Sequence, residues 1–373
     1  MSLIETLERK GPRKLLALDG GGIHGLISLE ILSRIEELLR GELGRDDRFV
    51  LADYFDYIAG TSTGAIIAAG LSIGMKVAQV RVFYTDHARK MFRKGSLFTR
   101  HLYKYRAVEL KAALQEVFGA ETELGSPILK TLLMIMLRNA TTDSPWPVSN
   151  NPSAKYNNPN SPGCNLKLPL WKLIRASTAA PTFFPPELVP LENHKFVFVD
   201  GAVSPYNNPA FQLFLMATLK AYRLNWPTGE DKMLLVSVGS GADSYADTAL
   251  RPSRMNLLYH ALRLPLVLLA GANVEQDLLC RSFGRCVCGE PIDNEVGDLL
   301  GQDGEGAVDP KLFTYARYNV ELSRSGLDSM KLGDIRVKDV GPLDAFRHID
   351  ALRRIGQTAS KKVQKEHFAK FLF

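Results

Sequence analysis

The sequence predicts an α/β protein in which a mainly parallel sheet is covered by helices on both faces, in three layers. Three observations support this fold class. Short apolar runs that are typical of buried strands alternate with segments whose apolar residues recur at helical spacing. Glycine-rich turns follow the first two of these runs. The chain has 373 residues, 46% hydrophobic and 23% charged, which is an ordinary composition for a globular protein with a sizeable core.

The expected elements follow one another in β-α order. The first strand, KLLALD, precedes a long helix, and the second strand, FDYIAG, runs into an apolar helix. We find no internal repeat and no clear linker, so we expect one domain over residues 1–373. The expected elements are a strand at 14–19, a helix at 25–43, a strand at 55–60, a helix at 62–74, and strands at 131–139, 195–200 and 231–239.

Three segments allow more than one interpretation. Residues 141–165 are rich in Asn, Pro and Ser, which is typical of a lid, a binding loop or a surface insert. Residues 87–106 interleave basic and aromatic side chains, so they could contact nucleic acid or lipid headgroups; we favour a solvated helix face with buried aromatics. Residues 361–373 form a basic amphipathic stretch, which either lies on a membrane or docks its phenylalanines on the core.

Charge, apolar runs and cysteine content bear on the expected location of the protein and on metal binding. The formal net charge of +6 fits a membrane surface, a phosphate-bearing substrate or nucleic acid and decides between none of them. The first 14 residues lack the apolar core of a secretory signal, and the most apolar runs are shorter than the roughly 20 residues of a membrane span. Cys280, Cys286 and Cys288 cluster, but no fourth zinc ligand stands at a familiar spacing. We therefore expect a cytoplasmic protein with reduced thiols and no metal.

A serine turn carries the first chemical signal. Gly60, Ser62 and Gly64 form G-x-S-x-G between an expected strand and an expected helix, the context of a nucleophile elbow. The positive end of that helix favours negative charge at the serine. No histidine after Ser62 stands in a comparable context, whereas Asp200 ends the strand at 195–200, just before Gly201. We expect this strand to run parallel to the serine strand, so that Asp200 and Ser62 face the same edge of the sheet.

A second glycine turn follows the first strand. Gly20, Gly22 and Gly25 satisfy G-x-G-x-x-G, the fingerprint of a dinucleotide-binding turn. That fingerprint requires an acidic residue about 20 positions later at the end of the second strand, which is absent here, and no Gly-Lys-Ser/Thr of a P-loop follows. Backbone N–H groups at the start of a helix also bind an oxyanion. We therefore interpret the turn as an oxyanion hole.

These motifs together resemble the patatin-like phospholipase family. DGGGIHG, GTSTG, and DGA followed by YNNP occur in this order, with supporting matches in DYFDYIAGTSTGA, IRASTAAPTFFPP and VSVGSG. The matches span about residues 13–240. Residues 250–373 carry no motif that can be assigned, and we expect them to pack on the same domain.

The resemblance implies a three-layer patatin-like fold and a lipid acyl hydrolase of the phospholipase A or lysophospholipase type, acting through an acyl-enzyme without a cofactor or metal. Ser62 would be the nucleophile and Asp200 the base. His24 is expected to be exposed at a helix start, and Ala202 stands where the family often has glycine. The oxyanion amides would come from Gly20, Gly21 and Gly22, and the supporting motif residues would be Asp19, Gly25, Gly60, Gly64 and Gly201.

The implied partners are a phospholipid or other glycerolipid substrate and a membrane surface that the protein contacts peripherally. Nucleic acid is not expected as a partner. Two alternatives remain open: an effector whose phospholipase activity is switched on by a nucleotide second messenger, and, ranked below it, a dinucleotide-binding protein.

Overall fold

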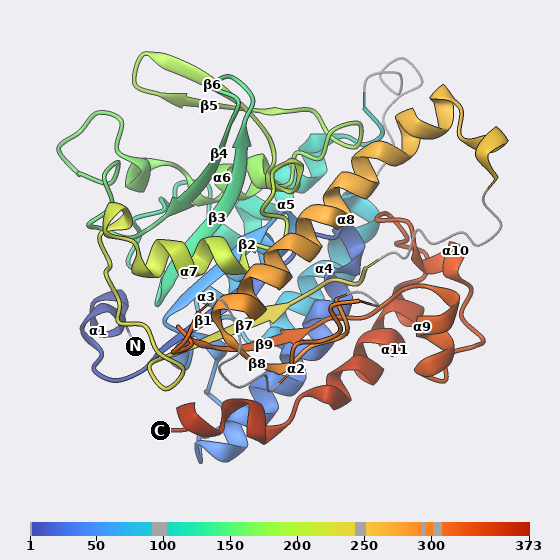
Figure 1. Cartoon of the computed structure of the whole chain (residues 1–373). Coiled ribbons are helices and arrows are strands. Elements are labelled where there is room, and N and C mark those ends of the chain that lie inside the picture. The colour runs from blue at the N-terminus through green and yellow to red at the C-terminus, as the bar shows by residue number, and fades with distance from the viewer. Residues whose placement is uncertain (1, 92–102, 243–250, 293–294, 301–307) are drawn as a thin grey trace.

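The computed structural model describes residues 2–91, 103–242, 251–292, 295–300 and 308–373, called the described ranges below. Within them, nine strands form one sheet in the order β5-β6-β3-β2-β1-β7-β9-β8, with β4 paired to β3 (Figure 1). The strands are β1 (Arg13–Leu18), β2 (Tyr57–Thr61), β3 (Leu132–Asn139), β4 (Ser144–Ser149), β5 (Glu187–Leu191), β6 (His194–Asp200), β7 (Met233–Val238), β8 (Arg285–Cys288) and β9 (Thr314–Tyr318).

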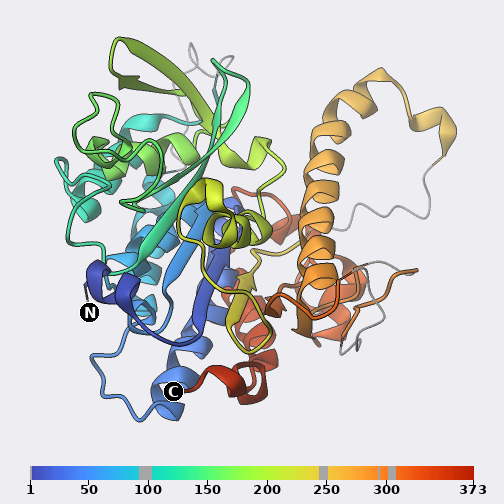
Figure 2. The same ribbon diagram turned by 60° about the vertical axis from the view of Figure 1, so that its left-hand side comes forward.

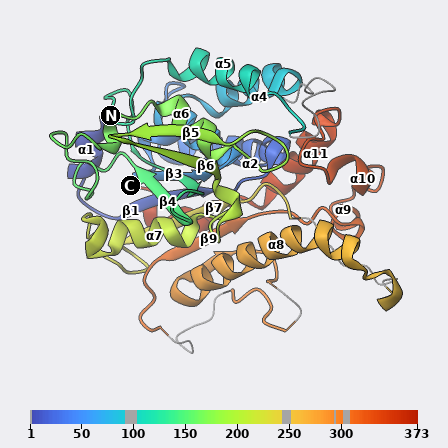
Figure 3. The same ribbon diagram turned by 90° about the horizontal axis from the view of Figure 1, so that it is seen from above.

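Helices cover both faces of the sheet, as the view from above shows (Figure 3). The larger core cluster joins one face to α2–α6 and α11, and the smaller cluster joins the other face to α1, α7 and α8. The helices of the described ranges are α1 (Leu3–Glu8), α2 (Gly25–Glu42), α3 (Thr63–Ser72), α4 (Val77–Met91), α5 (Ala107–Phe118), α6 (Leu170–Ser177), α7 (Ala210–Thr218), α8 (Leu257–Phe283), α9 (Arg324–Ser329), α10 (Val337–Val340) and α11 (Ile349–Ala359).

The centre of the sheet explains why its strands read as continuous apolar runs. β1 pairs in parallel with β2 on one side and β7 on the other. Leu16 and Leu18 belong to the core on one face, and Leu15 and Ala17 to the core on the other. A parallel strand buried on both faces needs apolar residues at every position rather than at alternate ones. The predicted α/β fold class, with a mainly parallel sheet between two helical layers, is confirmed.

Each element expected from the sequence is present, with ends that differ by at most two residues. The region beyond residue 250 adds β8 and β9 to the same sheet, where β9 pairs in parallel with both β7 and β8. This shared sheet favours the prediction of one domain.

Residues 141–165 were expected to be irregular, and this expectation was wrong for their first part. β4 lies there and forms an antiparallel hairpin with β3. β4 contains Pro145 and Pro147; it pairs with no described strand other than β3, and edge strands tolerate proline. The turns that follow are fastened by the buried Asn157, whose Nδ2 donates to the carbonyl oxygens of Ser149 (2.7 Å) and Asn151 (2.6 Å).

The two remaining ambiguous segments have different outcomes. In the C-terminal stretch, Phe368 and Phe371 are buried in the larger core cluster, so this stretch docks on the core. Most of the basic and aromatic segment 87–106, namely residues 92–102, lies outside the described ranges. Among the helices that the structure describes, none combines the length and the apolar character needed to cross a membrane.

Candidate functional site

Ser62 occupies a strained turn between β2 and α3. Its φ of 54° and ψ of −124° are backbone angles that non-glycine residues rarely adopt. The flanking glycines make the turn sterically feasible, because a Cβ on Gly60 would collide with the carbonyl oxygen of Gly64. The Ser62 N–H donates to Ser177 Oγ at 2.9 Å, so the end of α6 supports the turn. Ser62 itself is 8% exposed and directly precedes the first turn of α3.

Asp200 approaches Ser62 along a route that the sequence did not predict. Its strand, β6, was expected to run parallel to the serine strand, but β6 is antiparallel to β3. β2 pairs with residues 132–136 of β3, and β6 pairs with residues 137–139, while β4 takes the opposite edge. β2 and β6 therefore meet end to end along one edge of β3. This arrangement brings together the two residues that follow or end those strands, Ser62 and Asp200.

The two side chains form a direct hydrogen bond. Ser62 Oγ donates to Asp200 Oδ2 at 2.6 Å, and the Ala202 N–H donates to the other carboxylate oxygen at 2.8 Å. Asp200 is thus the N-cap of the short helix η4 (Gly201–Val203), which forms with alanine at position 202, where the family often has glycine. A side chain on the preceding Gly201 would collide with the carbonyl oxygen of Met136.

The environment of Asp200 alters its acidity. Asp200 is 2% exposed, and burial raises its pKa to about 7. The hydrogen bonds from Ser62 and Ala202 and the charge of the buried Arg175 lower the pKa and so oppose this rise. A carboxyl group with such a pKa is suited to exchange a proton with a hydroxyl near neutral pH.

The glycine turn after β1 lies beside Ser62. A Cβ placed on Gly20 would come within 3.0 Å of the Ser62 Cβ. The three predicted oxyanion donors differ in their hydrogen bonds. The Gly20 N–H donates to the Asn207 carbonyl oxygen at 3.2 Å, and the Gly21 N–H donates to Thr63 Oγ1 at 3.1 Å. The Gly22 N–H has no hydrogen-bond partner among the described residues, and Gly22 lines the cavity above Ser62.

The loop around residue 343 shapes this turn from the far end of the chain. The Ile23 N–H donates to the Leu343 carbonyl oxygen at 2.9 Å. Gly22 has a φ of +60°, and a Cβ there would collide with the same oxygen. His24, expected to be exposed, is 2% exposed, and its Nε2 lies 3.1 Å from the Pro342 carbonyl oxygen. Burial lowers the pKa of His24 to about 4, so it carries no charge at neutral pH and packs against this loop.

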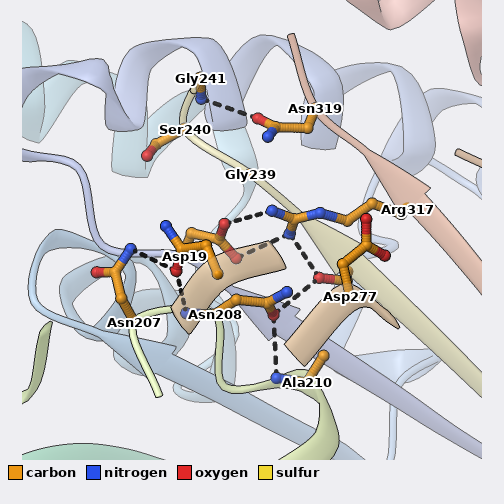
Figure 4. Close-up of polar contacts among 12 residues, drawn as sticks. Asp19, Asn207, Asn208, Ala210, Gly239, Ser240, Gly241, Asp277, Arg317 and Asn319 are labelled. Atoms are coloured by element: carbon orange, nitrogen blue, oxygen red, sulfur yellow. Dashed lines mark hydrogen bonds and ion pairs between the residues drawn. The ribbon is translucent and has the colours of Figure 1, made fainter. Parts of the chain in front are cut away.

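Asp19 anchors the turn through a buried ion pair with Arg317 of β9 (Figure 4). The two guanidinium nitrogens donate to the two carboxylate oxygens at 2.9 and 2.6 Å, and each side chain is 5% exposed. Arg317 also donates to Ser237 Oγ at 2.7 Å. Although burial opposes it, the Asp19 carboxylate raises the pKa of Arg317. Arg317 was missed from the sequence because no local motif surrounds it.

The first asparagine of YNNP supports the same turn from another side. Asn207 Nδ2 and Ser240 Oγ both donate to the Gly20 carbonyl oxygen, at 3.4 and 2.9 Å. Asn208 Oδ1 accepts from the Ala210 N–H at 3.1 Å at the start of α7 (Figure 4). Asn207 and Ser240 therefore support the backbone of the turn, whereas Asn208 fixes the start of α7.

The remaining predicted motif glycines sit at close contacts. A Cβ on Gly25 would lie 3.1 Å from the Tyr84 ring, and one on Gly64 would collide with the Leu18 carbonyl oxygen. Gly25 therefore allows α2 to pack on α4, and Gly64 allows α3 to pack on the end of β1.

A cavity of about 940 Å³ opens above Ser62 and Asp200. Gly20, Gly21 and Gly22 line it beside the serine. Its remaining walls are mostly apolar, as suits an acyl chain. The apolar side chains include Ile66, Leu110, Phe183, Phe184, Val203, Leu264, Leu268 and Leu269.

The cysteines lie away from this site. Cys280 and Cys286 are buried, and burial raises the pKa of Cys286 to about 12, which keeps it a neutral thiol. Within the part of the chain that the structure describes, no three His, Cys, Asp or Glu side chains cluster as metal ligands would.

Comparison with known proteins identifies the family. Residues 16–214 match the model of the family described as patatin-like phospholipase. The chain belongs to this family. It is 32% identical over 254 residues to an intracellular phospholipase A2 of Caenorhabditis elegans, covering 65% of this chain and 21% of that relative. It is 32% identical over 255 residues to patatin-T5 of Solanum tuberosum, covering 62% and 61%.

A bacterial relative, the cGAMP-activated phospholipase of Escherichia coli strain TW11681, is 28% identical over 257 residues, covering 66% of this chain and 67% of its own. The chain spans less than two thirds of the length of the nematode and potato relatives. In this member of the family, Arg317, Pro342 and Leu343 all lie outside the family match, so the supports they provide come from the C-terminal region.

Proposed function

We propose that the protein is a lipid acyl hydrolase that cleaves fatty-acyl esters of phospholipids or other glycerolipids through a Ser62–Asp200 dyad. The observation that carries the proposal is the 2.6 Å hydrogen bond from Ser62 Oγ to Asp200 Oδ2 at the base of an apolar cavity. Membership of a phospholipase family supports the lipid substrate.

The first half of the reaction forms an acyl-enzyme. Ser62 Oγ attacks the ester carbonyl carbon, and its proton moves to Asp200 Oδ2 along the existing hydrogen bond. The Gly22 N–H, and the Gly21 N–H once Thr63 Oγ1 rotates away, donate to the oxyanion. Each such donor is worth about 3 kcal/mol of transition-state stabilisation. Collapse of the tetrahedral intermediate breaks the ester C–O bond, and the leaving alkoxide takes the proton from Asp200.

The second half of the reaction releases the fatty acid. Water attacks the acyl carbon and gives its proton to Asp200, and collapse of this intermediate returns a proton to Ser62 Oγ. Because the pKa of Asp200 is about 7, the carboxylate can both accept and return a proton near neutral pH. His24 takes no part in this scheme, since it is buried and neutral.

The experiment is a lipidomic digest of phospholipid and glycerolipid vesicles by the wild type, Ser62→Ala and Asp200→Asn. We expect free fatty acids and lysolipids from the wild type alone, with a fall of about three orders of magnitude or more in each variant. Circular dichroism checks that both variants stay folded. Full activity in either folded variant contradicts the dyad.

Regulation by a nucleotide is a second proposal, favoured by the name of the E. coli relative. The same digest with and without added cGAMP tests it. A rise in the wild-type rate on addition supports nucleotide control, and an unchanged rate with substantial basal activity argues against cGAMP as the activator.

A further inference from the structure

The outer half of α8 presents an apolar face that no other described element covers. The helix starts at a cap, where Asn256 Oδ1 accepts from the Tyr259 N–H at 3.0 Å. Leu257, Leu264 and Leu268 are 87%, 54% and 65% exposed. Their spacing of seven and four residues places them on one side of the helix.

The inner half of α8 is attached to the protein in the usual way. Its buried side chains, Gln276, Cys280 and Arg281, belong to the last two turns, where the helix packs on α7, β8 and β9. Figures 1 and 2 both show the opposite end of α8 projecting past the neighbouring layers. Among the described side chains of α8, the buried ones therefore all lie at its inner end.

The apolar face continues into the cavity of the dyad. Leu264 and Leu268 line the cavity although more than half of each side chain is exposed, so they lie at its rim. Val203, three residues after Asp200, also lines the cavity and is 51% exposed. The rim thus carries exposed apolar side chains from two separate elements, an arrangement that marks an interaction surface.

Charge indicates what this surface contacts. Residues 251–274 contain three arginines and no aspartate or glutamate, and acidic residues resume with Glu275 and Asp277 in the inner half of α8. Arg251 and Arg254 lie just before α8, and Arg263 lies within it. A segment with exposed leucines and only basic charges has the chemistry of an element that lies in the interface of an anionic bilayer.

We propose that the outer half of α8 docks on the surface of a phospholipid bilayer and so places the cavity mouth against the lipid. The inference rests on the proposed function, because the bilayer that contacts the apolar face is also the bilayer that supplies the lipid substrate. A lipid then enters from the bilayer along Leu264 and Leu268 to the base of the cavity. Its acyl chain passes from one apolar environment to another without crossing water.

The test separates docking from hydrolysis. Binding is measured by co-sedimentation with vesicles of equal parts phosphatidylcholine and phosphatidylglycerol, using Ser62→Ala protein so that the lipid stays intact. The docking variant adds Leu257→Ser, from the apolar face, and Val267→Ser, which is 49% exposed beside that face; neither position lines the cavity. The control variant adds Ile4→Ser and Leu219→Ser, which are 67% and 45% exposed on α1 and beside the end of α7, away from the outer half of α8 (Figure 1).

We expect the docking variant to bind vesicles at least about tenfold more weakly, because two apolar side chains no longer leave water, and the control to bind as before. With Ser62 intact, the substitutions at Leu257 and Val267 should leave hydrolysis of soluble p-nitrophenyl butyrate unchanged. Equal vesicle binding by all three proteins overturns the docking proposal. So does a change in dimerisation by gel filtration without a change in vesicle binding, since a second copy would then cover α8.

Failure of the proposed function has a different signature. Wild-type protein that binds vesicles through α8 but never hydrolyses p-nitrophenyl butyrate or vesicle lipid would support the docking surface and contradict the hydrolase.

Discussion

Asp200→Asn should abolish activity while stabilising the protein, and the gain should grow with pH. Burial raises the pKa of Asp200 to about 7, against an ordinary value of 3.8. Between these values the folded protein keeps a proton that the unfolded chain has lost. The unfolded state binds fewer protons, so the free energy of unfolding falls as pH rises through this window.

The size of the effect follows from the two pKa values. At 1.36 kcal/mol per pKa unit, the buried carboxyl costs about 4 kcal/mol of stability at pH 8 and only about 2 kcal/mol at pH 5. Asparagine has the same shape and no charge at either pH. We therefore expect its stability relative to wild type to be about 2–3 kcal/mol more favourable at pH 8 than at pH 5.

Urea unfolding of the wild type and the Asp200→Asn variant at pH 5 and pH 8 measures this difference. The exposed Asp231→Asn serves as the control and should show the same small effect at both pH values. A change in unfolding free energy for Asp200→Asn that is equal at the two pH values refutes the reasoning, whatever its sign. The same pKa predicts that wild-type kcat/KM on a soluble ester falls about tenfold from pH 8 to pH 6.

Three further predictions concern packing around the site and core. Arg317→Met leaves the buried Asp19 carboxylate unpaired and should lower the free energy of unfolding by about 3–5 kcal/mol in urea titrations. A change below about 1 kcal/mol would contradict the buried pair. Gly22→Ala should abolish ester hydrolysis, because the new Cβ would collide with the Leu343 carbonyl oxygen. Gly41→Ala places its Cβ in open space and should retain ester hydrolysis. Phe368→Ala should lower the free energy of unfolding by about 3–5 kcal/mol, and the exposed Phe373→Ala should lower it by less than about 0.5 kcal/mol, in thermal or urea unfolding. Equal losses in the two variants would contradict docking of the C-terminal stretch on the core.

Local patterns carried most of the fold. β1 and β2 are recognisable because a strand buried on both faces must be apolar at every position, and the helices because their apolar residues recur at helical spacing. β4 was not recognised from the sequence. A segment with Pro145 and Pro147 can be a strand only at a sheet edge, and the local sequence does not show where the edge lies.

The candidate site divides in the same way. Ser62 and its two flanking glycines belong to one short motif, because the steric needs of the turn are met within five residues. The direction of β6, which brings Asp200 to Ser62, depends instead on how β3 shares its edge between two strands. That sharing is a property of pairing between segments that lie far apart in the sequence, and no local pattern encodes it.

By itself the sequence determined the fold class, the family resemblance and the candidate nucleophile and base, because each depends on residues close together in the chain or on motifs in a set order. Only the tertiary structure decided which glycine amide is open, that His24 is buried and neutral, and that Arg317 neutralises Asp19. These properties arise from contacts with residues distant in the sequence, such as Asn207 for the Gly20 amide, Pro342 for His24 and Arg317 for Asp19. Burial and charge neutralisation depend on what surrounds a group in space, and that is settled only when the chain folds.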